Sequence, residues 1–358
     1  MRYEQFDFHV KTLHHSEHIA RYRRGERPFA VNVEIDLTNG CNHRCSFCQW
    51  ADYIQASRAT LPANLVMKTL REIKALGGRS ITFTGGGEPT LHGSFIPILA
   101  EAHALGLASG LLTNGSLLRP GWDVELLERL VWLRASMAGG DRESYLAVQG
   151  RDDFEIVLAN LCRLATAKRT AGRGPDLGVA MLLNQTNAAS LPDMVERLIS
   201  AGVDYLQLRQ DMLAASSDKA WWIETALPAI RAAETRARGT TLNVLGARYM
   251  AGQGNLDYPS KCHAHHFVIA INAEGFVAFC KNTRDRPAFY LGNLHEETLT
   301  TIWERSTQCR ALEAEITPAN CGTFCKNMDI NIAVEDVVRG RAKPAPADSP
   351  APPHRDFL

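Results

Sequence analysis

The chain has 358 residues, of which 45% are hydrophobic, enough to bury a core and to form two domains. Its 39 basic and 39 acidic residues balance to a formal net charge of zero, which argues against broad nucleic-acid binding, because phosphate neutralisation needs a basic excess. It has no run of eighteen apolar residues and no apolar secretory signal near its start, so we expect a cytoplasmic protein without a membrane span.

Strand-like and helix-like segments alternate along the chain after an opening segment, residues 1–28, that we predict to be irregular. Short apolar or alternating runs predict strands at 29–37, 79–83, 107–112, 132–137, 177–183 and 203–208. Apolar residues at helical spacing predict helices between them, at 61–76, 95–105, 123–130, 153–170 and 191–200. This alternation is typical of parallel βαβ units and predicts an α/β fold, a partial (β/α)6 TIM-like barrel.

Residues suited to chemistry follow these predicted strands directly. A cysteine run, residues 41–48, comes after the first strand, and a glycine run, residues 85–87, comes after the second. Asn114, Ser136 and Arg209 stand at or near the ends of three later strands. Right-handed crossovers bring the carboxyl ends of parallel strands to one edge of the sheet. The sequence therefore predicts that these residues line one cleft.

The last third of the chain has a different organisation. A helix at 220–238 and a strand at 241–244 precede a second cysteine-rich region, in which residues 267–280 predict a β-hairpin with its turn at 272–275. The proline-rich tail has a composition typical of disorder. We therefore expect a lead-in over 1–28, a barrel over 29–240, a second domain over 241–338 and a disordered tail over 339–358.

Nine cysteines, an odd number, favour metal or redox chemistry over a disulfide framework. Cys41, Cys45 and Cys48 have the spacing C-x3-C-x2-C, and three thiolates can hold three irons of a cubane cluster while the fourth iron stays open to a ligand. A structural zinc site is the alternative, but zinc needs four closing ligands, and only His43 stands nearby as a fourth.

This cysteine spacing, followed about forty residues later by Thr84-Gly85-Gly86-Gly87-Glu88-Pro89, resembles the radical S-adenosylmethionine (radical SAM) enzymes. The resemblance implies that the first cluster binds S-adenosylmethionine (SAM) at its open iron. The reduced cluster would then split SAM into methionine and a 5′-deoxyadenosyl radical, which abstracts hydrogen from a C–H bond. An external electron donor, such as flavodoxin or ferredoxin, would supply the electron.

The same resemblance assigns roles to residues near the predicted cleft. Phe47 would stack near the adenine, and the glycine-rich segment Gly85 to Pro89 would approach SAM through its backbone, with Glu88 meeting the ammonium. Ser136 matches a serine that contacts the carboxylate or ribose, but a plain barrel-lining serine explains it equally well. Asn114 and Arg209 are cofactor-binding candidates by their strand-end position alone.

The second cysteine-rich region resembles the twitch domain, the short form of the SPASM domain. That resemblance implies one auxiliary 4Fe–4S cluster, and hence two clusters in the chain, with the auxiliary ligands Cys262, Cys280, Cys321 and Cys325. The last pair is spaced C-x3-C where C-x2-C is frequent, which leaves the fourth ligand less well defined.

Cys309 is left over and has three interpretations: a replacement ligand, a thiol that donates hydrogen to a substrate radical, or a packed small residue, which we favour because free cysteines are usually buried. His263 and His265, beside Cys262, would share one face of a strand. They would bind substrate, tune the cluster, or form a partly solvated surface.

The reaction is open between three outcomes: oxidation of a small polar substrate (a sugar, aminocyclitol or nucleoside), epimerisation of such a substrate, or crosslinking or epimerisation of a ribosomally made peptide. Because about thirty residues precede the first strand, too few for a peptide-binding domain, we favour a radical SAM oxidoreductase or epimerase acting on a small polar molecule in natural-product biosynthesis. A non-catalytic iron–sulfur or zinc-binding protein is the alternative of another class.

Overall fold

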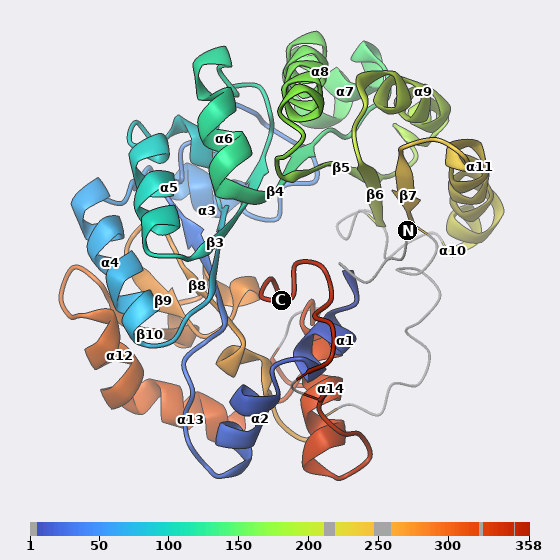
Figure 1. Ribbon diagram of the computed structural model, residues 1–358. Coiled ribbons are helices and arrows are strands. Elements are labelled where there is room, and N and C mark those ends of the chain that lie inside the picture. Colours follow the sequence, from blue (N-terminus) through green and yellow to red (C-terminus); the bar gives the residue numbers. More distant parts are fainter. Residues whose placement is uncertain (1–5, 211–218, 247–258, 322–324, 347) are drawn as a thin grey trace.

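The computed structural model describes residues 6–210, 219–246, 259–321, 325–346 and 348–358, and Figure 1 shows a curved sheet with helices along its outer side. One ten-stranded sheet runs in the order β10-β9-β8-β1-β2-β3-β4-β5-β6-β7. Neighbouring strands from β1 to β7 are all parallel. The predicted partial barrel is therefore confirmed.

The six predicted barrel strands all form, and so does the seventh strand that we expected near residue 241. Their bounds are β1 Asn32–Asp36, β2 Ser80–Thr84, β3 Ala108–Thr113, β4 Leu130–Ser136, β5 Asp176–Leu183, β6 Tyr205–Gln210 and β7 Asn243–Leu245. The helices between them are α4 Ala63–Ala75, α5 Phe95–Ala104, α6 Asp123–Arg129, α8 Phe154–Ala171, α9 Leu191–Ala201 and, after the short α10 Lys219–Trp221 and a π-turn, α11 Leu227–Ala237. Between the described barrel strands, two short helices form that were not predicted, α3 Ala51–Ala56 and α7 Arg142–Gln149.

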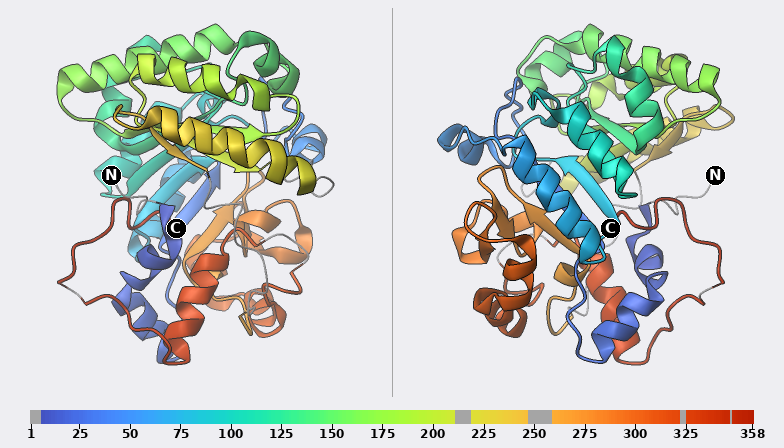
Figure 2. Two further views of the ribbon diagram at one scale, coloured as in Figure 1. Left: turned by 90° about the vertical axis from the view of Figure 1, so that its right-hand side faces the viewer. Right: turned by 60° about the vertical axis from the view of Figure 1, so that its left-hand side comes forward.

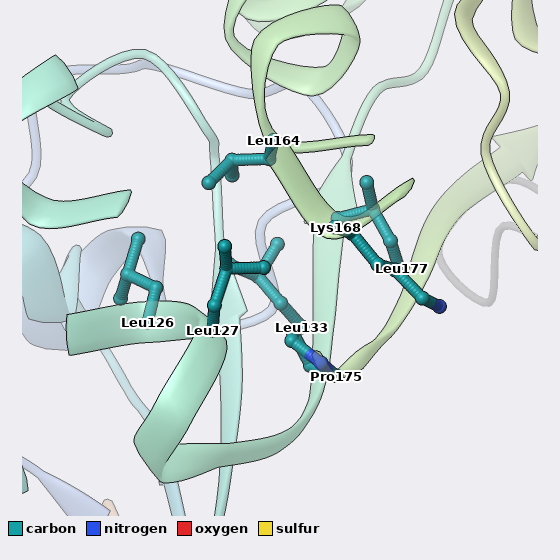
Figure 3. A pocket seen from close by; sticks show the side chains of 7 residues that line it. All are labelled: Leu126, Leu127, Leu133, Leu164, Lys168, Pro175 and Leu177. Atoms are coloured by element: carbon teal, nitrogen blue, oxygen red, sulfur yellow. The ribbon is translucent and has the colours of Figure 1, made fainter. Parts of the chain in front are cut away.

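The apolar faces of these helices pack on the outer face of the sheet. Figure 3 shows one place where the packing leaves a small gap of about 10 Å³, between the leucines of α6, α8, β4 and β5 and the stem of Lys168. A gap of this size is about the minimum that a water molecule needs, and its lining is almost entirely apolar, so we assign it no function.

The second cysteine-rich region continues the barrel sheet, which the sequence did not predict. Its hairpin consists of β8 Val268–Ile271 and β9 Phe276–Ala278, as expected, and β10 Tyr290–Asn293 adds a third strand. β8 pairs in parallel with β1, with Asn32 opposite Val268 and Ile35 opposite Ile271. The hairpin turn therefore lies at the same end of the sheet as the loop that follows β1. Helices α12 Leu299–Arg305, α13 Thr307–Glu315 and α14 Met328–Val338 complete the region.

The opening segment contains two helices, so the prediction of an irregular lead-in is wrong for most of its described residues. Helices α1 Phe8–Leu13 and α2 Ser16–Arg23 form there, and Figure 2 shows them beside α14, against which α1 packs. Each has eight residues or fewer, too short for a clear hydrophobic period. Their stability comes from buried contacts, as at Ile19, rather than from local sequence.

The proline-rich tail also differs from the predicted disorder. Phe357 and Leu358 are buried, and the Phe357 ring lies edge-on to Trp132, with ring centroids 5.4 Å apart. Ser80 Oγ donates a hydrogen bond to the Asp356 carbonyl at 2.5 Å, and Lys11 Nζ donates one to the Phe357 carbonyl at 2.8 Å. Composition predicted that the tail has no fold of its own, but it could not reveal the surface on which the tail docks.

Among the described residues, no helix is both long enough and apolar enough to cross a membrane.

Candidate functional site

The first cysteine loop, residues 41–48, and the glycine-rich segment, residues 84–89, lie side by side because they follow neighbouring strands. Asp36 at the end of β1 stands opposite Thr84 at the end of β2. Two backbone hydrogen bonds then join the glycine-rich segment to the residues directly before the loop, from Gly87 N to the Thr38 carbonyl at 3.2 Å and from Glu88 N to the Gly40 carbonyl at 2.8 Å. The predicted convergence of the two motifs is present in the structure.

The three thiols of the first cysteine loop lie close enough together for their charges to affect one another's pKa values. The pKa of Cys45 is raised to about 12, mainly by burial and also by the neighbouring Cys41 and Cys48. The C-terminus of α7 fixes the loop, since Arg44 N and Ser46 N donate to the carbonyls of Gln149 and Val148. Three soft donors in one tight loop fit an iron–sulfur cluster.

His43, the fourth ligand that a zinc site would need, is engaged elsewhere. It is buried, its Nε2 lies 3.2 Å from Asp153 Oδ2, and its Nδ1 lies 3.4 Å from Gln149 Nε2. Both ring nitrogens therefore have partners within the protein. This arrangement disfavours the zinc alternative and leaves the loop with three available sulfur ligands.

The glycines of the glycine-rich segment are required by the packing of the chain on itself. A Cβ on Gly87 would lie 2.1 Å from the Gly40 carbonyl oxygen, and one on Gly86 would lie 2.8 Å from Ile54 Cγ2. These clashes involve Gly40, directly before the first cysteine loop, and helix α3, which follows the loop. The glycines thus hold the two motifs together, whereas their predicted backbone approach to SAM stays a prediction.

Glu88 is buried, and its carboxylate accepts four hydrogen bonds from within the chain. Oε1 accepts from Thr90 N, Thr90 Oγ1 and Thr113 Oγ1 at 3.1, 2.5 and 2.6 Å, and Oε2 accepts from Asn114 N at 2.6 Å. Burial raises the pKa of Glu88, and these donors oppose the rise. The carboxylate joins the ends of β2 and β3, a structural role that the sequence did not predict. Pro89 begins the short 3-10 turn that follows.

The remaining predicted cofactor-binding residues lie at the same end of the barrel. Asn114 Nδ2 donates to Asn42 Oδ1 at 2.7 Å, which ties the end of β3 to the first cysteine loop. Ser136 ends β4, and its hydroxyl has no hydrogen-bond partner among the described residues. Arg209 is the second-last residue of β6, and Phe47 is half-buried within the cysteine loop. Their roles toward SAM stay predictions.

The second cysteine group, Cys262, Cys280, Cys321 and Cys325, also gathers in space. Burial raises the pKa of Cys262, and Cys280 and Cys325 raise it further. Burial likewise raises the pKa of Cys325 to about 11, with contributions from Cys280 and Cys321. Two amides donate to the sulfurs, Asn327 to Cys280 at 3.6 Å and Asn331 to Cys325 at 3.5 Å. Four thiols with such donors fit a second iron–sulfur cluster.

Arg284 connects the second cysteine-rich region to the barrel. The residues around it in the sequence did not predict this role. Its guanidinium is buried and forms ion pairs with Glu34 and Asp36, both on β1. The guanidinium carbon lies 5.4 Å from the centroid of the Trp50 ring. A buried arginine with two carboxylate partners and an aromatic neighbour fixes the position of one region on the other.

Cys309 and the histidines beside Cys262 are packed within the protein. Cys309 lies on α13, fully buried, and accepts a hydrogen bond at Sγ from Arg27 Nη2 at 3.0 Å. Its described contacts include none of the predicted SAM-site residues, so its role as hydrogen donor stays a prediction. The strand predicted for His263 and His265 is wrong, because a 3-10 turn, Ala264–His266, forms instead. Both are buried and pair with Glu335 and Glu313, so the predicted solvated surface is also wrong.

Comparisons with protein families match both cysteine regions. The family described as the radical SAM superfamily matches residues 35–172, and the SPASM family, described as an iron–sulfur cluster-binding domain, matches residues 262–327.

Curated relatives resemble the chain at low identity. The sporulation killing factor maturation protein SkfB of Bacillus subtilis is 26% identical over 298 residues, covering 81% of this chain and 68% of SkfB. A PqqA peptide cyclase of Methylorubrum populi is 24% identical over 297 residues, covering 78% of this chain and 73% of the cyclase. The match to a tungsten-containing aldehyde ferredoxin oxidoreductase cofactor-modifying protein of Pyrococcus furiosus, 26% identical over 180 residues, spans about half of that protein, 48%.

Among solved structures, Streptococcus suis SuiB bound to its precursor peptide SuiA aligns with a TM-score of 0.65 at 15% identity, covering 83% of this chain and 70% of SuiB. The anSMEcpe structure with bound AdoMet aligns with a TM-score of 0.58 at 15% identity, covering 84% of this chain and 87% of that one. At such identities these similarities establish the fold alone.

Proposed function

Because the chain belongs to the radical SAM superfamily and carries a C-terminal SPASM-type iron–sulfur domain, we propose that it is an enzyme that modifies a peptide by hydrogen abstraction. The family's cofactors are 4Fe–4S clusters and SAM. When bound, they supply the 5′-deoxyadenosyl radical that removes the hydrogen atom. An external flavodoxin or ferredoxin would provide the electron.

The observation that carries the peptide assignment is the length of the alignments with SkfB and the PqqA peptide cyclase. Each covers more than three quarters of this chain, so each must include parts of both the barrel and the SPASM region. The names of both proteins concern maturation or cyclisation of a peptide or protein factor. This favours the peptide alternative over the small polar substrate that we preferred from the sequence.

The protein's own residues would bind the cofactors as follows. Cys41, Cys45 and Cys48 would hold the first cluster, and the second cysteine group would hold the auxiliary cluster. The hydroxyl of Ser136, which has no hydrogen-bond partner in the described part of the chain, offers a polar contact for SAM from β4. Glu88 keeps the ends of β2 and β3 in place, so that the backbone at Asn114 is fixed before SAM binds.

The contacts of α1 and the tail at one end of the barrel support a mechanism that must exclude water. Helix α1 and the tail lie at the amino ends of the barrel strands, where Asp356 contacts Ser80 of β2 and Phe357 contacts Trp132 of β4. Radical chemistry requires walls that keep out other hydrogen donors. With this end covered, the substrate would enter from the opposite end, where the first cysteine loop lies.

The test uses anaerobic, reconstituted and reduced protein with SAM, and with a peptide encoded beside its gene. We expect 5′-deoxyadenosine to form and the peptide to lose hydrogen, seen as a decrease in its mass. The Cys45→Ala variant should produce neither. Absence of 5′-deoxyadenosine with both clusters loaded would contradict radical SAM activity, and turnover of a sugar or nucleoside in place of the peptide would contradict the peptide assignment.

A further inference from the structure

An acidic pocket lies between helix α3, which follows the first cysteine loop, and the strands of the SPASM region. Its volume is about 620 Å³, and the residues that matter for its chemistry are Tyr53, Glu274, Phe276, Asp285, Tyr290 and Glu296. None of these residues belongs to either cysteine site. The pocket is open to solvent and large enough for a long side chain with part of its backbone.

The position of the pocket places it next to the predicted SAM site. Glu274 lies in the turn between β8 and β9, and β8 runs parallel to β1, so this turn and the first cysteine loop share one end of the sheet. Tyr53 is five residues after Cys48, and a Cβ on Gly86 would lie 3.6 Å from its ring atom Cδ1. Tyr53 therefore forms a wall between the glycine-rich segment and the pocket.

The pocket carries three carboxylates and no basic side chain in its lining. Among the described residues, Glu274, Asp285 and Glu296 form no ion pair, and Glu274 accepts a hydrogen bond from Tyr53 Oη at 3.2 Å. Among the described residues, no hydrogen-bond donor reaches Oδ1 of Asp285, an atom that is buried. Because a buried carboxylate oxygen without a donor is costly, a basic side chain that donates to Asp285 from within the pocket would be stabilised there.

The aromatic side chains complete a site for a long cation. The rings of Phe276 and Tyr290 are stacked, with centroids 4.3 Å apart and planes at 15°. The pKa of Tyr290 is raised to about 12, mainly by burial and also by the charges of Glu274 and Asp285. A flat aromatic wall suits the aliphatic stem of lysine or the guanidinium plane of arginine, while the carboxylates bind the charged end.

We propose that the acidic pocket binds a lysine or arginine side chain of the peptide that this enzyme modifies. The inference rests on the proposed function for the identity of the ligand as a peptide. The positive charge and the long stem of the ligand are inferred from the pocket itself. There, net negative charge, a carboxylate oxygen without a donor among the described residues and a stacked aromatic pair occur together beside the predicted SAM site.

The test measures binding of fluorescein-labelled pentapeptides Gly-Gly-Xaa-Gly-Gly to the cluster-loaded protein by fluorescence anisotropy, with Xaa as lysine, arginine or norleucine. A charge-assisted hydrogen bond in a partly buried site changes affinity by about tenfold or more. We therefore expect the lysine and arginine peptides to bind at least about tenfold more tightly than the norleucine peptide. Equal binding of all three would overturn the inference.

Matched variants assign the binding to this pocket. Asp285→Asn and Glu296→Gln should each weaken binding of the lysine peptide, and Glu296 is exposed, so its replacement leaves the fold intact. Glu297→Gln is the control, because Glu297 is an exposed neighbour outside the lining. Equal weakening by Glu297→Gln would indicate general surface charge and overturn the inference, as would displacement of the peptide by one equivalent of Ca²⁺.

The same preparation separates this inference from the proposed function. Formation of 5′-deoxyadenosine by the wild-type protein without selective binding of the cationic peptides would contradict the pocket assignment and leave radical SAM activity intact. Selective binding that depends on Asp285, in protein that forms no 5′-deoxyadenosine, would uphold the cation site and contradict the catalytic proposal.

Discussion

Lys326 donates a hydrogen bond from Nζ to Oε1 of Gln49 over 3.0 Å. Lys326 directly follows Cys325, and Gln49 directly follows Cys48, so this one contact joins the two cysteine sites. The cations Arg209, Lys281 and Arg284 also lie close enough to lower the pKa of Lys326, after the larger effect of burial. The chain therefore concentrates positive charge where two clusters with thiolate ligands would sit.

We predict that Lys326→Gln lowers the reduction potential of the auxiliary cluster at pH 6, where Lys326 is charged because its pKa is lowered only to about 7. Removing a nearby positive charge makes the reduced, more negative cluster less stable, and one charge at close range should shift the potential by tens of millivolts. An anaerobic redox titration followed by electron paramagnetic resonance measures the shift. Lys68→Gln, at an exposed lysine on α4, is the matched control and should leave the potential unchanged. A potential that rises in Lys326→Gln would rule out this electrostatic role.

The four donors on Glu88 predict a large effect of a neutral replacement. In Glu88→Gln, an NH₂ group replaces one of the two carboxylate oxygens. Both oxygens accept hydrogen bonds, so the NH₂ group would face an N–H or O–H donor, and at least one buried hydrogen bond would become a repulsive contact. We expect the free energy of unfolding to fall by about 3 kcal/mol, the upper end of the range for hydrogen bonds to charged groups. Urea unfolding measures it, and Glu101→Gln, which removes a surface pair with Arg71, should cost less than about 1 kcal/mol.

The two cysteine groups predict a simple result for iron content. Wild-type protein reconstituted without oxygen should contain about eight irons per chain. Cys45→Ala and Cys262→Ala should each lose about half of that iron, because the sites use different cysteines. Cys162→Ala, on the half-buried face of α8, should keep all of it. Loss of all iron in either single ligand variant would show that the two sites do not assemble independently.

The burial of Lys11 predicts a pH dependence of stability. Burial lowers the pKa of its amine from 10.5 to about 7. Between these values the unfolded chain holds a proton that the folded protein does not, so unfolding takes up a proton. The free energy of unfolding contributed by Lys11 therefore rises as the pH increases from about 7 toward 10.5, by at most about 1.4 kcal/mol per pH unit.

Lys11→Met should remove this part of the pH dependence. Urea midpoints of the wild-type protein and the variant, compared at pH 7 and pH 9, test it, because other groups titrate alike in both. A second variant, Lys343→Met, replaces an exposed lysine of the tail and should follow the wild type. Identical pH profiles for wild type and Lys11→Met would contradict a neutral buried amine.

Local patterns predicted the barrel because each unit repeats a local rule. A short apolar strand, a polar loop and an amphipathic helix follow one another six times, and parallel strands with right-handed crossovers have few other ways to pack. The cysteine spacings were equally informative, since C-x3-C-x2-C places three thiols within one loop without help from the rest of the fold. The thiols of both groups do gather as that analysis expected.

Contacts between segments that are distant in the sequence could not be predicted from local patterns. The pairing of β8 with β1 brings together residues more than 230 positions apart, and the docking of Phe357 on Trp132 joins the tail to β4. The ion pairs of Arg284 with Glu34 and Asp36, and the enclosure of Glu88 by donors from β3, arise in the same way. Each depends on a register or a packing position that no short window of sequence contains.

The sequence by itself determined the βαβ succession, the two thiol sets and the family of chemistry, because these depend on residue types at short, fixed spacing. The tertiary structure alone decided which charges are buried, how the second cysteine region joins the sheet, and that three carboxylates and two stacked rings surround one pocket. Burial and charge pairing are set by neighbours that the chain meets only after folding, and for that reason they follow from the fold and not from the order of the residues.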